Sequence, residues 1–215
     1  MKKGFLPFLV FLLLLGCADL AAQGLRINGM ANGVFGDKFD NYYSSNSYMR
    51  GKIQGGFQWG AGLEYQPSPY YGIEILYLNM QTEAPIEYWR VGEQFRVVDL
   101  GIHHILLGGR RYMQASEILE GYGGFLAGVV IFDNKNPVAG EPNSVTKLAL
   151  GARLGGNLWV TDIIGINVNA QFLTAVQAFG GSFYFGTGGS GAGVSTYSTI
   201  FQFGLGGGLA IRLGQ

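Results

Sequence analysis

The sequence predicts an all-β fold, namely an eight-stranded antiparallel up-and-down transmembrane β-barrel. Apolar residues alternate with small or polar ones along much of the 215-residue chain, which is the period of a strand whose side chains point to opposite faces. Glycine is abundant (37 residues) and charged residues make up only 13%, about half of their share in soluble domains. Long polar connections alternate with short turns, as in barrels that cross a membrane.

The first 22 residues are predicted to be a signal peptide that is removed, which leaves 23–215 as a single barrel domain. Two lysines precede an apolar run at 5–15, and small residues follow up to Ala22, as in export signals. The run is shorter than the ~20 residues that a membrane-spanning helix needs. A lipoprotein-like cut before Cys17 is an alternative. An export signal of this type places the mature protein in a bacterial cell envelope.

The last strand, Thr199 to Leu213, shows the alternation over its whole length. One face carries Phe201, Phe203, Leu205, Leu209 and Ile211, and the other carries Gln202, Arg212 and small residues. We expect this strand to close the barrel by pairing with residues 25–35, which removes both open sheet edges.

The same pattern predicts seven earlier strands and four external loops. The strands are expected at about 25–35, 53–65, 71–77, 95–112, 121–132, 147–158 and 164–172, and the loops at 36–52, 82–93, 133–144 and 180–198. The alternation blurs at His103 and His104, where a β-bulge would explain the slip. The connections after the second, fourth and sixth strands are tight turns. They fall on the side of the barrel where both chain ends lie, as expected for an even number of strands.

The polar faces are predicted to line the lumen and the apolar faces to meet lipid. A soluble lipocalin-like barrel, with apolar faces inside, is the alternative. However, the polar faces contain glycine, amides and isolated charges of both signs rather than the dense Lys and Glu of a solvated surface. The expected lumen network is Arg26, Glu64, Glu74, Asp99, Arg153 and Arg212. Aromatic residues near strand ends, expected at the membrane interfaces, are Tyr65, Tyr71, Tyr77, Tyr112 and Trp159.

The chain resembles the small eight-stranded outer-membrane barrels of Gram-negative bacteria, and in particular the Bacteroidetes-type outer membrane protein beta-barrel domain. The resemblance rests on the signal end Ala21-Ala22-Gln23, the glycine-rich strands and the run 201–213. It implies an outer-membrane location, contact with outer-membrane lipid and insertion by the barrel assembly machinery. The chain departs from these proteins at its end, Leu213-Gly214-Gln215, where they commonly finish on an aromatic residue.

No catalytic, metal or cofactor site is predicted. His103 and His104 are adjacent on a strand and face opposite ways, so they cannot share one metal without a bulge. Asp99 lies near them, but no nucleophile motif marks any serine, including Ser44, Ser45 and Ser195. The glycines at 204–208 lie within a strand pattern with no helix after them, which excludes a dinucleotide loop. The formal net charge of zero gives no reason to expect nucleic acid as a partner.

The expected function is that of a non-enzymatic envelope barrel whose lumen is charged and largely filled. Its loops, with Tyr42, Tyr43 and Tyr48 in the first, are candidates for contact with an external protein or glycan. The alternatives are a barrel enzyme acting on outer-membrane lipid or peptide, and a soluble lipid-binding barrel.

Overall fold

The computed structural model describes residues 24–44, 47–89, 93–136, 143–176 and 200–213. The predicted signal peptide, the 180–198 loop and half of the 133–144 loop (residues 137–142) lie outside the described residues. The described part contains ten β-strands. No helix within it is long and apolar enough to cross a membrane.

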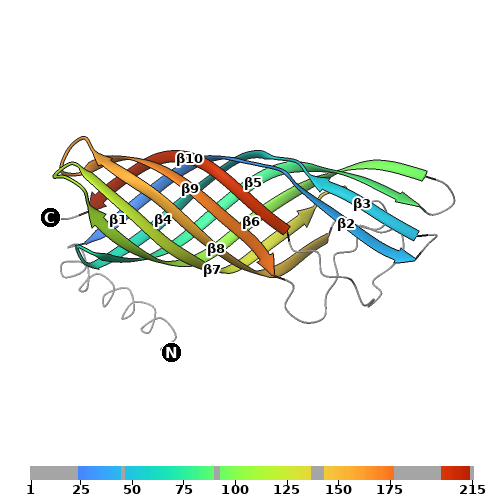
Figure 1. The fold of residues 1–215 in the computed structure, drawn as a ribbon, viewed down its shortest axis with the longest axis horizontal. Helices are drawn as coiled ribbons and strands as arrows, with labels where there is room; N and C mark the ends of the chain where they lie inside the picture. The colour runs from blue at the N-terminus through green and yellow to red at the C-terminus, as the bar shows by residue number, and fades with distance from the viewer. Residues whose placement is uncertain (1–23, 45–46, 90–92, 137–142, 177–199, 214–215) are drawn as a thin grey trace, which may run out of the picture.

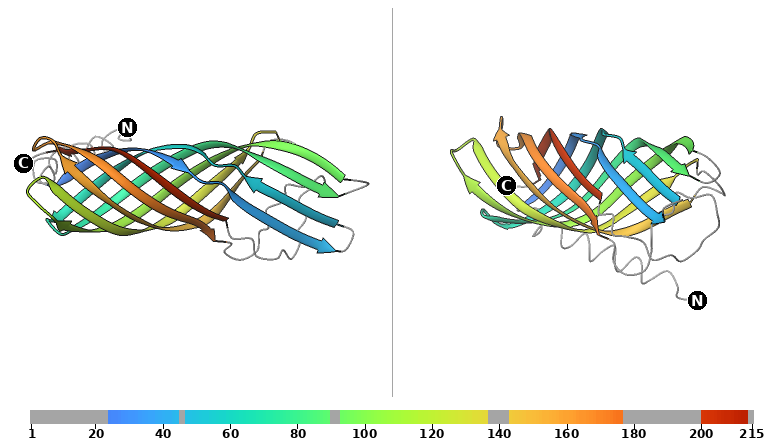
Figure 2. Two further views of the ribbon diagram at one scale, coloured as in Figure 1. Left: turned by 45° about the horizontal axis from the view of Figure 1, so that its top comes forward. Right: turned by 45° about the vertical axis from the view of Figure 1, so that its right-hand side comes forward.

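Eight of the strands form a closed antiparallel barrel (Figure 1). They are β1 (Leu25–Val34), β4 (Gly56–Ser68), β5 (Tyr71–Trp89), β6 (Glu93–Gln114), β7 (Leu119–Asn134), β8 (Asn143–Trp159), β9 (Ile164–Val176) and β10 (Ile200–Leu213). Each pairs with the next in this order, and β10 pairs with β1 to close the ring. The strands run obliquely around a common axis (Figure 2). The predicted barrel and its closing strand are therefore confirmed.

The remaining two strands form a hairpin that extends beyond the barrel, and this corrects two predicted loops. β2 (Asp37–Ser44) and β3 (Ser47–Ile53) pair with each other, and β3 pairs with the far end of β5. β5 and β6 stay paired up to Trp89 and Glu93. Residues 37–44 and 47–52 of the first predicted loop, and 82–89 and 93 of the second, are thus strand, not loop. A strand beyond a membrane can be polar on both faces, so polar composition alone does not indicate irregular structure.

Short turns at the opposite end are stabilised by side-chain hydroxyls. The Thr161 Oγ1 accepts hydrogen bonds from the backbone N–H of Ile163 (3.2 Å) and Ile164 (2.9 Å). The Ser116 Oγ accepts one from the backbone N–H of Leu119 at 3.2 Å. Local bonds of this kind from Ser and Thr favour tight turns. The predicted short turns after β4, β6 and β8 are confirmed.

The outer face of the barrel wall is apolar from the middle of the barrel toward the end with the short turns. Phe125, Leu154 and Val168 are 79%, 66% and 65% exposed, although large apolar side chains are normally buried in soluble proteins. The outward side chains of β10 are those predicted, including Phe201 and Leu209. This arrangement contradicts the lipocalin-like alternative, which needs the apolar faces inside.

The lumen is divided into two halves of different polarity. Near the short turns the inward side chains are mainly charged or amide groups, whereas toward β2 and β3 they are mainly apolar, with Lys147 and Asn134 among them. The buried apolar set includes Leu76, Leu78, Met80, Leu100, Ile102, Leu106, Leu126, Val130, Phe132 and Leu173. The predicted bulge at His103 and His104 is wrong, because β5 and β6 pair without any register shift. The alternation is unclear in the sequence there because the inward side chains change from apolar to polar along β6, while the same positions continue to face inward.

Candidate functional site: the charged lumen

Two buried carboxylates form the centre of the polar half of the lumen. Glu64 on β4 and Glu74 on β5 are direct cross-strand partners, and both are 0% exposed. Like charges directly opposite each other destabilise a sheet, and an unpaired buried carboxylate costs several kcal/mol. The pair therefore requires donors and positive charge close by.

Arg110 on β6 supplies that charge to both carboxylates at once. Its Nη1 donates to Glu64 Oε2 at 3.1 Å and its Nη2 to Glu74 Oε2 at 2.5 Å. The Asn28 amide bridges the same two groups with bonds of 2.9 Å each. The Tyr112 hydroxyl donates to Glu64, and Arg153 Nη1 lies 3.3 Å from Glu74 Oε2. Hydrogen bonds between charged groups, such as those from Arg110 to the two carboxylates, belong to the strong class.

Glycines beside the carboxylates make room for them. A Cβ added at Gly62 would overlap the Glu74 carboxylate, and one added at Gly72 would overlap that of Glu64. Both glycines therefore have a steric reason to be glycine, which is the close approach of a buried side chain rather than a turn.

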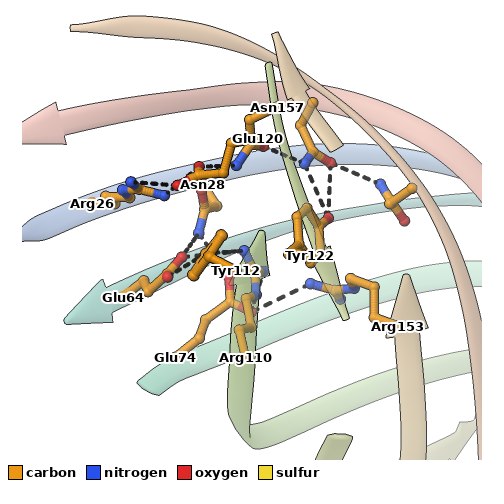
Figure 3. A network of polar contacts seen from close by, with 12 residues as sticks. Arg26, Asn28, Glu64, Glu74, Arg110, Tyr112, Glu120, Tyr122, Arg153 and Asn157 are labelled. Atoms are coloured by element: carbon orange, nitrogen blue, oxygen red, sulfur yellow. Dashed lines mark hydrogen bonds and ion pairs between the residues drawn. The ribbon is translucent and has the colours of Figure 1, made fainter. Parts of the chain in front are cut away.

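A second ion pair crosses the lumen from wall to wall. Arg26 Nη1 and Nη2 donate to the two carboxylate oxygens of Glu120 at 2.9 and 3.2 Å. Arg26 is on β1 and Glu120 on β7, which lie four strands apart on either side of the eight-stranded ring. The Arg26 guanidinium also lies 5.0 Å from the ring centroids of Tyr112 and Trp159, within the range of cation–π attraction. This pair joins opposite walls directly (Figure 3).

Amide groups extend the network along β8 and β9. The Asn157 amide donates to Glu120 at 3.1 Å, and Asn167 donates to Asn157 at 2.7 Å and to the Tyr122 hydroxyl at 3.0 Å. Farther along β9, Gln171 accepts from Arg153 at 3.4 Å. These bonds link the two ion-pair clusters to the remaining wall.

The charges of the network balance. Three carboxylates (Glu64, Glu74 and Glu120) face three guanidinium groups (Arg26, Arg110 and Arg153), and none of the six residues is more than 6% exposed. An eight-stranded barrel has an interior about wide enough to be filled by side chains. The arrangement is therefore suited to holding the walls together and blocking the lumen.

Four of the six predicted lumen residues belong to this network, namely Arg26, Glu64, Glu74 and Arg153. Arg212 lies at the end of the lumen, where its guanidinium stacks 3.5 Å from the Trp159 ring centroid and donates to the Asp162 carbonyl at 3.3 Å.

The prediction that Asp99 faces the lumen is wrong, because its side chain is exposed on the outer face of β6. At this level the apolar residues Val98 and Leu100 face the lumen. The expectation that apolar side chains face outward along the whole strand does not hold there.

Several members of the network were not predicted, above all Arg110, Tyr112 and Glu120. Tyr112 and Trp159 were expected at the membrane interface but are 2% and 5% exposed and face inward. The alternation along β6 could have placed them, because Arg110 and Tyr112 lie an even number of residues after the inward Ile102 and therefore share its face. The supposed bulge hid that signal.

The two histidines lie on opposite faces of β6. His104 faces the lumen and is 3% exposed, whereas His103 is on the outer wall beside Tyr77, Asn79 and Asp133. In the described part of the chain, no group of three or more His, Cys, Asp or Glu residues is placed to hold a metal ion. Ser45 and Ser195 lie outside the described residues, and Ser44 is the last residue of β2.

Comparison with known proteins shows the fold. No family model matches the chain, and no curated protein matches its sequence. Among solved structures, Neisserial surface protein A is similar, with a TM-score of 0.59 and 10% identity over 88% of this chain and 97% of that chain. The outer membrane protein OprG from Pseudomonas aeruginosa is similar with a TM-score of 0.56 and 12% identity over 89% and 96%. The chain therefore has the eight-stranded fold of outer-membrane barrels.

Proposed function

We propose that this protein is a non-enzymatic β-barrel of the bacterial outer membrane, closed to ion flow and presenting a projecting β-sheet to the exterior. The observation that carries the proposal is an exchange of faces along β5 and β6. Near the short turns, apolar side chains face outward and charged ones inward, as lipid requires. Farther along, Asp99 is exposed and Leu100 is buried, as in a barrel surrounded by water.

The height of the outer apolar belt supports this placement. Between the exposed Arg111 and His103, the outward positions of β6 are Gly109, Leu107 and Ile105. The eight steps span ~27 Å at ~3.4 Å per residue, or about 20 Å of height for a strand tilted by ~40°. That value is close to the ~25 Å apolar band of outer-membrane barrels.

The proposal includes an orientation and a role for the projecting sheet. Short turns lie in the periplasm in such barrels and the longer connections outside, so β2, β3 and the far ends of β5 and β6 would extend from the cell. Tyr42, Tyr43 and Tyr48 lie on the β2–β3 hairpin and remain the candidates for contact with an external protein or glycan. The Bacteroidetes resemblance, the signal peptide and insertion by the assembly machinery are parts of the same proposal and rest on the sequence.

The surroundings of the histidines favour the non-enzymatic proposal over a barrel hydrolase. The described partners of His103 are a tyrosine, an asparagine and an aspartate, not a serine or cysteine that it could activate.

Cysteine labelling in intact cells tests the orientation. Phe95→Cys on β6 and Ile118→Cys in the turn after β6 alter side chains that are 66% and 56% exposed at opposite ends of the barrel. A membrane-impermeant maleimide is expected to label Phe95→Cys in intact cells and Ile118→Cys only after permeabilisation. The parent chain, with Cys17 as its single cysteine, provides the background. Labelling of both sites in intact cells, or recovery of the protein in the soluble periplasm, contradicts the proposal.

A planar-bilayer recording tests closure of the lumen. The purified barrel is expected to insert without producing steady conductance steps, because buried side chains occupy both halves of its lumen. A stable ohmic conductance from heat-modifiable, folded protein overturns this part of the proposal.

A further inference from the structure

One charged side chain lies on the outer wall among uncharged ones, near the short turns. Arg111 is exposed on the outer face of β6. Its outward neighbours along the same strand are Gly109 and Met113, of which Met113 is 65% exposed. Its direct cross-strand partners are Tyr71 on β5 and Gly123 on β7. Arg111 therefore interrupts a surface that is otherwise without charge.

The Arg111 guanidinium has no partner within the protein. Among the described residues it makes no ion pair, hydrogen bond or ring contact. The carboxylates nearest to it in sequence belong to Glu117, in the turn after β6, and to Glu120, which faces the lumen and binds Arg26. A cation on the lipid face of a barrel costs ~2–4 kcal/mol at the middle of the bilayer and ~0–1 kcal/mol near its interfaces. An anion from outside the protein would therefore stabilise Arg111.

The other charges of the outer wall lie far from Arg111. On the strands that the structure describes, the remaining charged side chains that are not directed into the lumen lie toward the opposite end of the barrel, namely Asp37, Lys52, Glu83, Asp99, Asp133 and Lys135. No carboxylate on the described part of the wall is therefore placed to repel an anion at Arg111, and no second cation on it competes for that anion.

An apolar groove begins next to Arg111, on the side away from the short turns. It has a volume of about 550 Å³ and is lined by Ile73, Leu107, Gly109, Phe125, Ala127 and Leu150, among others. Gly109 lies in its floor, where an added Cβ would meet nothing within 4 Å. The groove is therefore open at the point nearest to Arg111, and its larger side chains form its borders.

We propose that Arg111 and the adjoining groove bind one glycerophospholipid of the leaflet on the side of the short turns. The inference rests on the membrane placement proposed above, in which this is the periplasmic leaflet. The guanidinium donates hydrogen bonds to the phosphodiester, because its planar pair of N–H groups matches two phosphate oxygens. An acyl chain of the same molecule lies in the groove over Gly109.

The order of the two features along β6 matches a phospholipid in that leaflet. Arg111 is nearer to the short turns than the groove is, just as a headgroup is nearer to the periplasm than its acyl chains. From Arg111 to Gly109 is two residues, or ~7 Å along the strand at ~3.4 Å each, and about 5 Å of height at a tilt of ~40°. Tyr71, directly opposite Arg111 and 54% exposed, is of the residue type that is enriched at membrane interfaces.

A choice between two lipids tests the phosphate contact. Purified protein, stripped of lipid in detergent, is examined by native mass spectrometry with equal amounts of phosphatidylglycerol and of a galactosyl diacylglycerol that has the same acyl chains but no phosphate. The parent is expected to retain phosphatidylglycerol about twofold more than the galactolipid. Arg111→Gln is expected to remove this preference, and Arg111→Lys to keep it, because the cation remains.

Two further variants provide the matched controls. Lys135→Gln makes the same change of charge at an exposed position toward the opposite end of the barrel, and should leave the preference for phosphatidylglycerol unchanged. Gly109→Leu fills the floor of the groove, and Gly29→Leu adds the same side chain on β1, where a Cβ also meets nothing within 4 Å. Retention of both lipids is expected to fall about twofold in Gly109→Leu relative to Gly29→Leu.

Each part of the proposal has its own contrary result. Equal retention of the two lipids by the parent, or a preference that survives in Arg111→Gln, overturns the phosphate contact. Loss of the preference in Lys135→Gln as well would assign it to the overall charge of the protein, which also overturns the site. Equal retention by the two leucine variants overturns the groove. Failure of the parent to float with liposomes contradicts the membrane placement instead, so the failures are distinguishable.

Discussion

Glu64 and Glu74 are direct cross-strand partners with fully buried carboxylates, and one guanidinium, that of Arg110, bonds to both. The pair is compatible with a folded barrel because other strands supply compensating charge, Arg110 from β6 to both carboxylates and Arg153 from β8 to Glu74.

Arg110→Ala is expected to destabilise the barrel by about 3–5 kcal/mol, the cost of leaving a buried charge uncompensated. The effect is measured as the free energy of unfolding in urea for protein in lipid vesicles. The folded fraction at each urea concentration is read from heat-modifiable gel migration. Arg111→Ala is the matched control, because Arg111 is the next residue and is exposed on the outer face. It should change stability by less than about 0.5 kcal/mol. Similar losses in both variants would show that the ion pairs do not account for the effect.

Gly72→Ala is expected to lower the yield of folded barrel, because the added Cβ overlaps the Glu64 carboxylate, which is fixed by Arg110 and Tyr112. Gly29→Ala adds the same atom on β1, where nothing lies within 4 Å, and should fold like the parent. Refolding into detergent micelles, scored by the fraction of heat-modifiable protein, compares them. Equal yields would mean that the Glu64 side chain moves aside without cost.

The apolar half of the lumen should behave like the core of a water-soluble protein. Leu78→Ala removes a side chain that is 0% exposed and is expected to cost about 2–5 kcal/mol. Leu209→Ala, on the outer wall at 52% exposure, leaves no internal cavity and should cost clearly less. Chemical unfolding of both variants under one set of lipid conditions tests the difference. A larger loss for Leu209→Ala would contradict a packed apolar lumen.

Removal of Glu64, Glu74 and Arg110, the central cluster of the charged network, should not open a pore. In a variant combining Glu64→Ala, Glu74→Ala and Arg110→Ala, the lumen remains obstructed by Leu78, Leu106 and other buried apolar side chains. Planar-bilayer recordings of protein that migrates as a folded barrel are expected to show no steady conductance. The appearance of regular steps would locate the only barrier to ions in the polar half.

Strand alternation was sufficient to predict the closed barrel, because a period of two reports directly on which side chains share a face. It was also sufficient to place Arg26, Glu64, Glu74 and Arg153 in the lumen. It failed for Asp99, since alternation separates two faces without saying which is inside. That choice depends on whether lipid or water surrounds the strand.

The same ambiguity explains the residues that were missed. The inward face of β6 changes from Leu100 and Ile102 to Arg110 and Tyr112 without a change of phase. The pairing of Arg26 with Glu120 depends on the curvature of the closed ring, because the two residues are 94 positions apart. No local pattern carries that information.

The Arg26–Glu120 ion pair connects β1 across the lumen to β7 in the opposite wall. The seam between β1 and β10 is held by backbone hydrogen bonds along the circumference, whereas this ion pair restrains β1 across the diameter. Spreading the seam sideways would therefore also require pulling β1 off a buried carboxylate. The join between the two ends of the sheet is reinforced from within by a residue that belongs to neither of its strands.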